Sequence, residues 1–463
     1  MSTTMPLPVE RESSEPVALG TRVGAPPRSV TSADGSADGA VRRSLEIFQR
    51  LARGYASPDF SVRFWDGSVW TPDSVRSPLF TIVLHHPSAL RRMFLHHSQV
   101  ELGEAYLTGD FSVEGDLESS FRLADHLIAR RLSLVERLWA ARALLKLPLE
   151  PSIDLGWRAA DVKGTRHSRL RDRKVVTYHY DTSNEFFAVW LDSAMVYSCA
   201  YFSHEAESLE KAQRRKLDYV CRKLRLQPGE RLLDIGCGWG GLVIQAARHF
   251  GVDAVGITLS EPQALLARGR IQQARLSESC QVEVRDYREM PGDGQFDKIA
   301  SVGMVEHVGL ANLPEYLRSA WRLLRPGSAF LLHGIGESPA SKARRGPSFA
   351  DHYVFPDSEL PEIGALLQAA EACGFEVRDV ESLREHYVLT LRRWRERLEA
   401  NREQAVQSAS AAAYELWRLF MAGAAYRFRV GHYNLYQTLL VKPECGASKL
   451  PLTRADWYAA PPQ

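Results

Sequence analysis

The spacing of apolar residues changes along the chain. Residues 1 to about 38 hold few large apolar side chains and are rich in Ser, Thr, Pro, Gly and Ala. Such a segment cannot offset its chain entropy by burial, so we expect a disordered tail over residues 1–38. Apolar residues then alternate over 64–70 and 80–84 and recur at helical spacing over 117–128. This pattern predicts a small α+β domain over residues 39–150.

A basic segment follows this domain. Between Trp157 and Lys174 the chain carries seven Lys or Arg residues against two Asp residues. We predict a basic linker or surface loop over residues 151–175. It is either a solvated connection or an anchor for anionic lipid headgroups.

From residue 176 to 463, helical patterns alternate with short β-branched or Leu-rich runs. Strands are predicted over 231–235, 253–258, 281–285, 298–302 and 329–333, and helices over 209–226, 242–250, 261–275 and 312–325. Alternation of this kind is typical of βαβ units around a parallel sheet. The sequence therefore predicts an α/β fold with a doubly wound sheet, preceded by the smaller domain.

Composition and charge exclude several classes of protein. The chain has 463 residues, of which 45% are hydrophobic and 25% charged, as in globular proteins. A net charge of +2 argues against a protein whose main task is binding nucleic acid. No apolar run is long enough to span a membrane, and the first thirty residues lack the apolar stretch of a signal peptide. The six cysteines form no CxxC pair, so we expect reduced thiols, no metal site and a cytoplasmic protein.

The sharpest motif is a glycine-rich turn after the strand at 231–235. Asp234, Gly236, Gly238 and Gly240 occur at alternate positions, and a helix is predicted to follow. Glycines there let a ligand approach the backbone at the carboxyl edge of the sheet. A nicotinamide-binding turn is the alternative, but its spacing is G-x-G-x-x-G. The turn instead resembles the first motif of class I S-adenosylmethionine-dependent methyltransferases.

Two later segments extend this predicted site. Thr258, Leu259, Ser260 and Gln263 follow the second strand, and the spacing of Ser260 and Gln263 also fits a helix-capping box. After the third strand the sequence Asp286-Tyr287-Arg288 offers a carboxylate and an aromatic ring to an adenine. The alternative for these three residues is a surface turn.

Further segments make the resemblance more specific. They are 179–187 and 197–202, both dense in aromatic and polar residues, and 301–309, which places Glu306 and His307 after the fourth strand. Together with the glycine turn they resemble the cyclopropane fatty-acyl-phospholipid synthase family, which includes the mycolic acid cyclopropane synthases. The resemblance runs over residues 175–442, closes on the segments 417–420, 428–431 and 436–442, and extends more weakly to 102–110 in the small domain.

The resemblance implies a seven-stranded methyltransferase sheet and a set of site residues. It places contacts to S-adenosylmethionine on Tyr197, Ser198, Gly236, Gly238, Thr258, Leu259, Gln263, Tyr287 and Arg288. The motifs themselves add Asp234, Gly240, Ser260 and Asp286. It also implies a bicarbonate ion held by the catalytic residues Cys199, Glu306, His333 and Tyr387, with the backbone of Ile335 nearby. Two departures are Ala424, where some members have a cysteine, and Phe349, where relatives often have Trp.

The function implied is methyl transfer from S-adenosylmethionine to the cis double bond of an unsaturated fatty acyl phospholipid, followed by bicarbonate-assisted closure of a cyclopropane ring. One alternative is the same transfer giving a methylene- or methyl-branched chain with a partner reductase. Others are a non-catalytic lipid-binding regulator and a small-molecule C- or N-methyltransferase.

Such an enzyme needs access to a bilayer, so we expect peripheral association with the inner face of the cell membrane. The candidate docking elements are the basic linker, the cluster Lys342, Arg344 and Arg345, and the small N-terminal domain. The family resemblance also implies a homodimer.

Overall fold

The computed structural model of the protein describes residues 36–57, 59–72, 77–96, 98–130, 132–149, 164–180, 183–342 and 348–458. Most of the predicted tail lies outside these ranges, as do Arg344 and Arg345, the side chain of Lys342, and the linker residues Arg158 and Lys163. The first helix begins at Ser36, so the last three residues of the predicted tail are helical.

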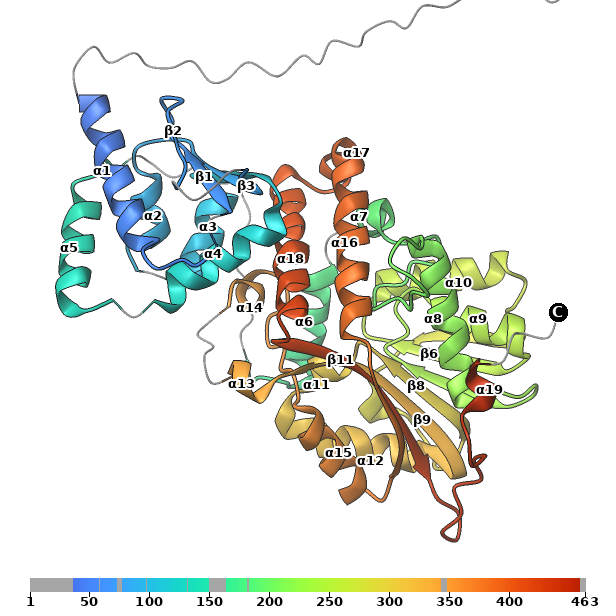
Figure 1. Cartoon of the computed structure of the whole chain (residues 1–463). Coiled ribbons are helices and arrows are strands. Elements are labelled where there is room, and N and C mark those ends of the chain that lie inside the picture. Colours follow the sequence, from blue (N-terminus) through green and yellow to red (C-terminus); the bar gives the residue numbers. More distant parts are fainter. Residues whose placement is uncertain are drawn as a thin grey trace, which may run out of the picture.

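A mostly parallel seven-stranded sheet organises the larger domain (Figure 1). The strands are β5 (Arg231–Ile235), β6 (Asp253–Thr258), β7 (Cys280–Val284), β8 (Phe296–Val302), β9 (Leu324–Glu337), β10 (Glu376–Ser382) and β11 (Tyr433–Lys442). Their order is β10-β11-β9-β8-β5-β6-β7, and β11 runs antiparallel to both of its neighbours. The predicted doubly wound sheet is confirmed.

Helices cover both faces of this sheet, and alternate strand residues meet them. Leu232 of β5 packs in one core with Leu217 of α8 and Val243 of α9. Leu233, the next residue along β5, packs in a second core with Leu317 of α12 and Leu366 of α15. The larger domain contains the helices α8 (Leu209–Leu224), α9 (Gly241–Phe250), α10 (Glu261–Gln273), α11 (Val305–Val308), α12 (Leu313–Leu323), α13 (Pro339–Lys342), α14 (Phe349–Tyr353), α15 (Ile363–Ala372) and α19 (Ala455–Tyr458), with 3₁₀ turns at Tyr287–Glu289 and Leu310–Asn312.

The smaller N-terminal domain is α+β, as predicted. Its strands β1 (Phe60–Arg63), β2 (Val69–Trp70), β3 (Phe80–Leu84) and β4 (Phe111–Gly115) form a sheet in the order β2-β1-β3-β4. Its helices are α1 (Ser36–Leu51), α2 (Ala89–Phe94), α3 (Gln99–Leu107), α4 (Leu117–Ala129) and α5 (Leu134–Leu145).

The alternating run 64–70 holds only a short strand. Its last two residues are β2, and residues 64–68 form the hairpin turn between β1 and β2, closed by a bond from the Phe64 N–H to the Ser68 carbonyl. The Asp66 carboxylate accepts the Ser68 N–H, and Gly67 supplies a positive φ of 87°. An Asp-Gly pair therefore turns the chain where the apolar alternation suggested a continuous strand.

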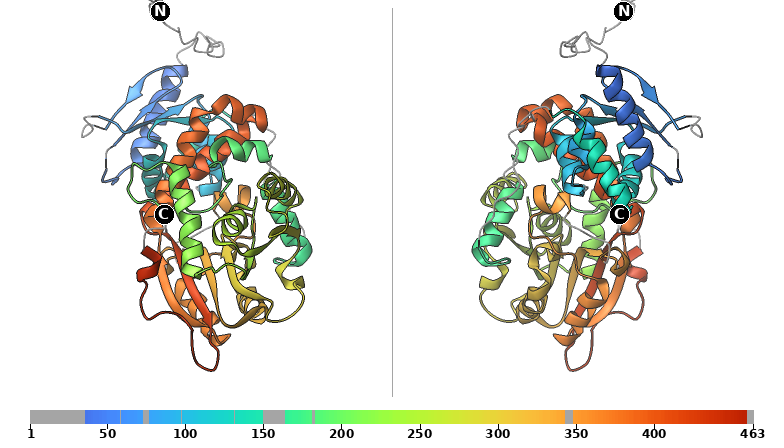
Figure 2. Two further views of the ribbon diagram at one scale, coloured as in Figure 1. Left: turned by 90° about the vertical axis from the view of Figure 1, so that its right-hand side faces the viewer. Right: turned by 90° about the vertical axis from the view of Figure 1, so that its left-hand side faces the viewer.

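A helical layer joins the two domains (Figure 2). Its helices are α7 (Asn184–Trp190), α16 (Arg384–Ala400), α17 (Arg402–Ser408) and α18 (Ala411–Arg429). Helix α18 packs against α4 of the N-terminal domain, and the two share one hydrophobic core. Arg392 and Arg429 both pair with Glu118 of α4, which is almost fully buried. None of the described helices is long and apolar enough to cross a membrane.

The basic linker differs from the prediction. Its described part includes helix α6 (Arg169–Tyr180), where a loop was expected. Arg171 makes a two-pronged contact with Asp357, and Arg169 pairs with Glu289 at 3.2 Å. The arginines thus bind acidic side chains of the larger domain, which explains why this segment is ordered against it instead of forming a solvated loop.

Candidate active site

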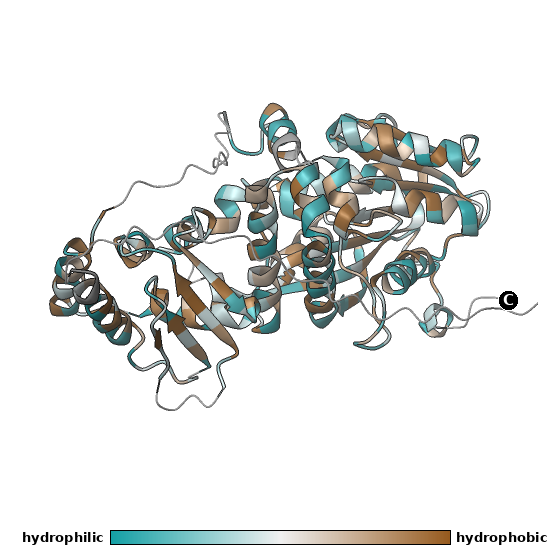
Figure 3. Ribbon diagram, turned by 90° about the horizontal axis from the view of Figure 1, so that it is seen from above, coloured by the Kyte–Doolittle hydropathy of each residue, from teal (hydrophilic) through white to brown (hydrophobic). Residues whose placement is uncertain are grey.

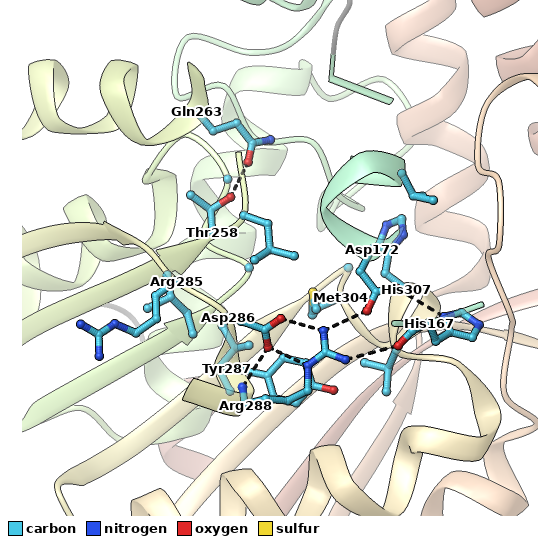
Figure 4. Close-up of a pocket in the computed structure, with 18 of the residues that line it drawn as sticks. His167, Asp172, Thr258, Gln263, Arg285, Asp286, Tyr287, Arg288, Met304 and His307 are labelled. Carbon is cyan, nitrogen blue, oxygen red and sulfur yellow. Dashed lines mark hydrogen bonds and ion pairs between the residues drawn. The ribbon is translucent and has the colours of Figure 1, made fainter. Parts of the chain in front are cut away.

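A cavity of about 80 Å³ lies where β5, β6, β7 and β8 end at their carboxyl edge (Figure 4). Eight of the expected cofactor contacts line it: Gly236, Gly238, Thr258, Leu259, Gln263, Asp286, Tyr287 and Arg288. Open α/β sheets bind ligands at this edge. The geometry therefore brings the motifs of three different strands to one pocket.

The glycine turn forms the floor of the pocket. Gly236 has a φ of 83°, which a residue with a Cβ rarely adopts, and a Cβ there would lie 3.4 Å from the Met304 side chain. Gly240 is the N-cap of α9 and does not line the cavity. Asp234 does not line it either. It is buried beneath the turn, where burial raises its pKa to about 7 and the charge of Lys216 opposes that rise.

The segment from the end of β6 to the start of α10 both caps that helix and lines the pocket. Ser260 caps α10 by accepting the Gln263 N–H at 3.4 Å and does not line the cavity. The Gln263 side chain does not complete a capping box. Its Oε1 instead accepts a bond from the Thr258 hydroxyl at 2.8 Å, and both residues line the pocket. Capping and pocket formation thus fall to neighbouring residues of one segment.

An ion-pair network closes the opposite wall of the pocket. Arg288 donates to Asp286 through Nε at 2.8 Å and through Nη2 at 2.6 Å, and its Nη2 also contacts Asp172 at 2.9 Å (Figure 4). Burial alone would raise the pKa of Asp286, but the hydrogen bonds and charge of Arg288 bring it below its usual range. Asp286 is therefore ionised at neutral pH, and the surface-turn alternative for this segment is wrong because Asp286 and Tyr287 are buried.

The linker supplies pocket residues that the sequence did not indicate. His167, Asp172 and Val175 line the cavity from α6 and the turn before it. No motif marks these residues, because the segment reads only as basic. Met304 and Asp357 are further lining residues that the motifs did not single out.

A second cluster of polar side chains lies beside this pocket, at the ends of β8 and β9. Glu306 Oε1 accepts the Ile335 backbone N–H at 2.7 Å, and the Nδ1 of His333 meets the Gln437 amide at 3.1 Å. The other polar atoms, Glu306 Oε2 and His333 Nε2, are buried and have no hydrogen-bond partner among the described residues. Gln437 was not predicted; it faces His333 because β11 pairs with β9 in that register.

Burial sets the protonation of this cluster. It raises the pKa of Glu306 to about 7, a rise that the Ile335 hydrogen bond opposes. It lowers the pKa of His333 well below its usual value, with the Lys216 and Lys223 charges adding to the effect. His333 is therefore neutral at physiological pH.

The Leu383 carbonyl group contacts both Cys199 and Tyr387. The Cys199 thiol lies 3.9 Å from the Leu383 carbonyl, which also accepts the Tyr387 N–H at 3.1 Å. The Leu383 N–H in turn donates to Leu435, whose register partner in β9 is Ile335. Burial raises the pKa of the Cys199 thiol far above its usual value, so it stays neutral. These contacts connect the backbone segments that carry the expected bicarbonate residues, and the Tyr387 ring packs against Trp394 and Phe428.

Tyr197 and Ser198 do not line the cofactor cavity. The Tyr197 ring packs among Phe187, Trp190 and Trp394. The Ser198 hydroxyl accepts a bond from the buried Lys216 ammonium at 2.9 Å. Lys216 was not predicted, and burial lowers its pKa to about 8. Nowhere in the described part of the chain do three or more His, Cys, Asp or Glu side chains gather to bind a metal ion.

Comparison with known proteins decides the family. The model of the mycolic acid cyclopropane synthetase family matches residues 167–438, and that of a domain of unknown function matches 47–126. The chain belongs to the mycolic acid cyclopropane synthetase family. As in other members, the enzyme is an S-adenosylmethionine-dependent methyltransferase with the class I fold.

Relatives match over different lengths. A probable fatty acid methyltransferase of Pseudomonas putida is 38% identical over 86% of this chain and 95% of its own. The tuberculostearic acid methyltransferase of Mycobacterium tuberculosis is 32% identical over 86% and 92%. The solved mycolic acid cyclopropane synthase CmaA1, in complex with SAH and CTAB, is 34% identical, covers 58% of this chain and 97% of its own, and has a TM-score of 0.55. These relatives indicate methylation or cyclopropanation of fatty acyl lipids.

This family member has a second, larger cavity of about 580 Å³ between its two domains. The lining is mainly apolar and comes from α3 and α4 on one side and from α14, α18 and β11 on the other. Ala424 and Phe349, the two departures from the family pattern, both line it. Gly103 of α3 also lines it, and a Cβ there would lie 2.2 Å from the Phe349 ring. The weakly matching segment 102–110 therefore serves the contact between the domains.

Aromatic rings connect the two cavities. Phe420 lines the large cavity and contacts Phe355, with ring centroids 5.4 Å apart. Phe355 in turn lies 6.0 Å from the ring of His307, which lines the cofactor pocket. A row of aromatic rings thus runs from the apolar cavity to the cofactor pocket.

Proposed function

We propose that the enzyme transfers the methyl group of S-adenosylmethionine to the cis double bond of an unsaturated fatty acyl chain of a phospholipid and closes a cyclopropane ring with bicarbonate as the base. The observation that carries this proposal is that Glu306 Oε2 and His333 Nε2, which lie after β8 and in β9, are buried and have no hydrogen-bond partner among the described residues. Buried polar atoms are normally paired, so this pair fits a small polar ligand.

When bound, S-adenosylmethionine supplies an electrophilic methyl group and bicarbonate supplies the base. Methyl transfer would break the S–CH₃ bond, with its electron pair staying on sulfur, join the methyl carbon to one alkene carbon and leave a cation on the other. The ring closes when a proton leaves the new methyl group and its electron pair forms the second bond. The protein must therefore hold a base close to the cation and keep stronger nucleophiles away.

The residues around Glu306 meet these requirements. Neutral His333 can donate its Nε2–H to an anion, because Nδ1 is the atom that faces the Gln437 amide. Glu306 is held through Oε1 by the Ile335 N–H, so its carboxyl group is aimed by the backbone. The neutral Cys199 thiol is a poor nucleophile, which suits a site that must tolerate a carbocation.

The large cavity is suited to the acyl chain. Its apolar lining can hold a lipid tail, and the aromatic wall formed by Phe420, Phe355 and His307 leads toward the cofactor. Aromatic faces stabilise a cation without attacking it. The substrate lies in a bilayer, so we propose peripheral association with the inner face of the cell membrane and, from the family resemblance, assembly as a homodimer.

A second candidate is favoured by the relatives that match both domains. One of these is named a probable fatty acid methyltransferase and another a tuberculostearic acid methyltransferase, whereas CmaA1 covers only 58% of this chain. In this candidate the proton leaves from elsewhere and gives a methylene-branched chain, which a partner reductase could convert into a methyl branch. A non-catalytic regulator and a small-molecule methyltransferase are disfavoured by the family and by the volume of the apolar cavity.

One experiment tests the proposal and separates the candidates. Purified protein is incubated with S-adenosylmethionine and vesicles of cis-monounsaturated phospholipid, with and without added bicarbonate, and the lipid is analysed by mass spectrometry and proton NMR. A gain of one CH₂ with high-field ring protons, dependent on bicarbonate, is expected. Vinylidene protons would favour the second candidate, and a rate independent of bicarbonate would refute the role of the base.

The matched variants are Glu306→Gln and Glu315→Gln. Glu306→Gln should bind S-adenosylmethionine normally but lose ring formation, because its Oε2 is replaced by an amide nitrogen. Glu315 is an exposed acid of α12, so its replacement should leave the rate unchanged. Equal rates for both variants would remove Glu306 from the mechanism.

A further inference from the structure

Helix α5 of the N-terminal domain presents large apolar side chains to solvent. Leu134 and Val135 are each 77% exposed, and Leu138 is 59% exposed. Leu145 and Leu149 extend the row at 55% and 69%. Five of the fifteen large apolar side chains that stand most exposed in the described chain thus fall within residues 134–149. We call this set the α5 face.

The α5 face is separate from the side of the helix that packs on the domain. Leu134, Leu138 and Leu145 are spaced by four and seven residues, so they project from one side of the helix. Ala140 and Leu144 are buried on the other side, toward α1 and α2. A surface helix normally buries its apolar side, whereas α5 also carries large apolar side chains on its exposed side. The exposed apolar side of α5 therefore packs against no other element of the described structure.

Basic side chains surround the α5 face. Over residues 132–149 the chain carries three basic residues, Arg137, Arg142 and Lys146, against the single acid Glu136, and the three are exposed. Glu136 is already engaged, because it pairs with Arg130 at 2.8 Å and caps the helix with Ser133. The rim of the face is thus positively charged.

A small basic hollow adjoins the same helix. It measures about 170 Å³ and is lined by Arg50, Arg53, Arg130, Trp139 and the acid Glu136, among others. The Arg50 guanidinium stacks on the Trp139 ring at 3.9 Å. Arg130 is already bonded to Glu136 and to two backbone carbonyls, so Arg50 and Arg53 are the groups of this hollow that suit a phosphate, which arginine binds in two-pronged fashion.

The position of α5 connects this surface to the acyl cavity. The last turn of α4 lines the large cavity with Leu127, Ile128 and Ala129, and the next residue, Arg130, lines the basic hollow. Figure 1 shows α1 and α5 at the end of the N-terminal domain that points away from the larger domain. At that end in Figure 3, the helices carry both apolar and polar segments.

We propose that the α5 face docks on an anionic phospholipid bilayer, with its leucines in the boundary between headgroups and acyl chains and its arginines on lipid phosphates. Charge complementarity favours this occupant over a second copy of the chain, because a two-fold contact would bring two basic rims together. The docking segment lies outside both family matches, which cover 47–126 and 167–438. The inference rests on the proposed function in one respect only, namely that the substrate of the enzyme is a membrane lipid.

The test is sedimentation of the full-length protein with vesicles of phosphatidylcholine and phosphatidylglycerol. Leu134→Gln combined with Leu138→Gln should lower binding by about a hundredfold, from about tenfold for each buried leucine side chain. The matched control combines Leu265→Gln and Leu452→Gln in the larger domain. The Leu265 side chain is 69% exposed and the Leu452 side chain is fully exposed. The control should bind vesicles like the natural protein, and melting curves should show that both variants are folded.

Further measurements make the outcomes distinct. Arg137→Gln with Arg142→Gln should weaken binding to anionic vesicles but leave the weak binding to neutral vesicles unchanged. The α5 variant should methylate detergent-dispersed phospholipid at the normal rate and lose activity only on vesicles. Vesicle binding that depends on α5 would uphold docking even if no lipid were methylated, which would refute only the proposed function. Normal vesicle binding by the α5 variant, or its conversion from dimer to monomer, would overturn the docking role.

Discussion

Replacing Glu306 with glutamine is expected to stabilise the folded protein at alkaline pH. Glu306 is 6% exposed, and burial raises its pKa from the ordinary value of 4.5 to about 7. One pKa unit corresponds to about 1.4 kcal/mol, so the ionised carboxylate costs the folded state about 3 kcal/mol relative to the unfolded chain. Glutamine cannot ionise and still accepts the Ile335 N–H. The variant therefore avoids this cost.

The sign of the effect depends on pH. Well below pH 4.5 the carboxyl group is protonated in both states, and there is no cost. Between pH 4.5 and about 7 the unfolded chain has lost the proton and the folded protein keeps it, so the free energy of unfolding falls as pH rises. Above about pH 7 the full cost applies. The variant should therefore gain about 1 kcal/mol at pH 5 and about 3 kcal/mol at pH 8.

The assay is urea unfolding followed by tryptophan fluorescence at both pH values. Glu315→Gln on the surface of α12 is the control, and its free energy of unfolding should not change with pH relative to the natural protein. A gain for Glu306→Gln that is as large at pH 5 as at pH 8 would refute the reasoning, as would no gain at pH 8. Confirmation would mean that the enzyme keeps a destabilising acid for its chemistry.

Three more predictions concern the two cavities. Asp172→Asn removes the charge that ties α6 to Arg288, so calorimetry should show S-adenosylmethionine binding weakened about fivefold to tenfold, and an unchanged Kd would contradict the role given to α6. Gly236→Ala forces a side chain onto a φ of 83° and should weaken cofactor binding about tenfold, whereas Gly269→Ala, with open space around it in α10, should not. Ala424→Phe adds a ring to the large cavity and should raise the KM for long acyl chains more than for short ones, with cofactor affinity unchanged. A chain-length preference identical to that of the natural protein would show that this cavity does not hold the acyl group.

Local pattern predicted much of the larger domain. The strands at 231–235 and 253–258 were placed correctly to the residue, because a short buried run between glycine or proline turns defines both ends of a strand. The turn from Gly236 to Gly240 was found for the same reason. The run 64–70 shows the limit of this reasoning, since alternation alone does not reveal that Asp66 and Gly67 close a hairpin.

The predicted cofactor contacts fall into two groups, those that line the pocket and those that do not. Residues at or just after the end of a strand, such as Thr258 and Asp286, line the pocket, because parallel strands end at one edge. Ser260 caps α10, as its spacing from Gln263 suggested. Tyr197 and Ser198 do not line the pocket. Their surroundings depend on which helix packs over them, and that is not readable from neighbouring residues in the sequence.

The sequence by itself determined the order of elements and the glycine turn, because these depend on neighbours a few positions apart. The polar residues expected around Glu306 came instead from the resemblance to a family, since they lie far apart in the chain. Only the tertiary structure decided that α6 walls the cofactor pocket and that Gln437 faces His333 across the strand pairing. It likewise decided that Lys216 lies buried against Ser198 and that two domains enclose an apolar cavity. The physical reason is that burial, pKa and cavity shape arise from contacts between residues far apart in the chain, and no local pattern records what will pack against a side chain.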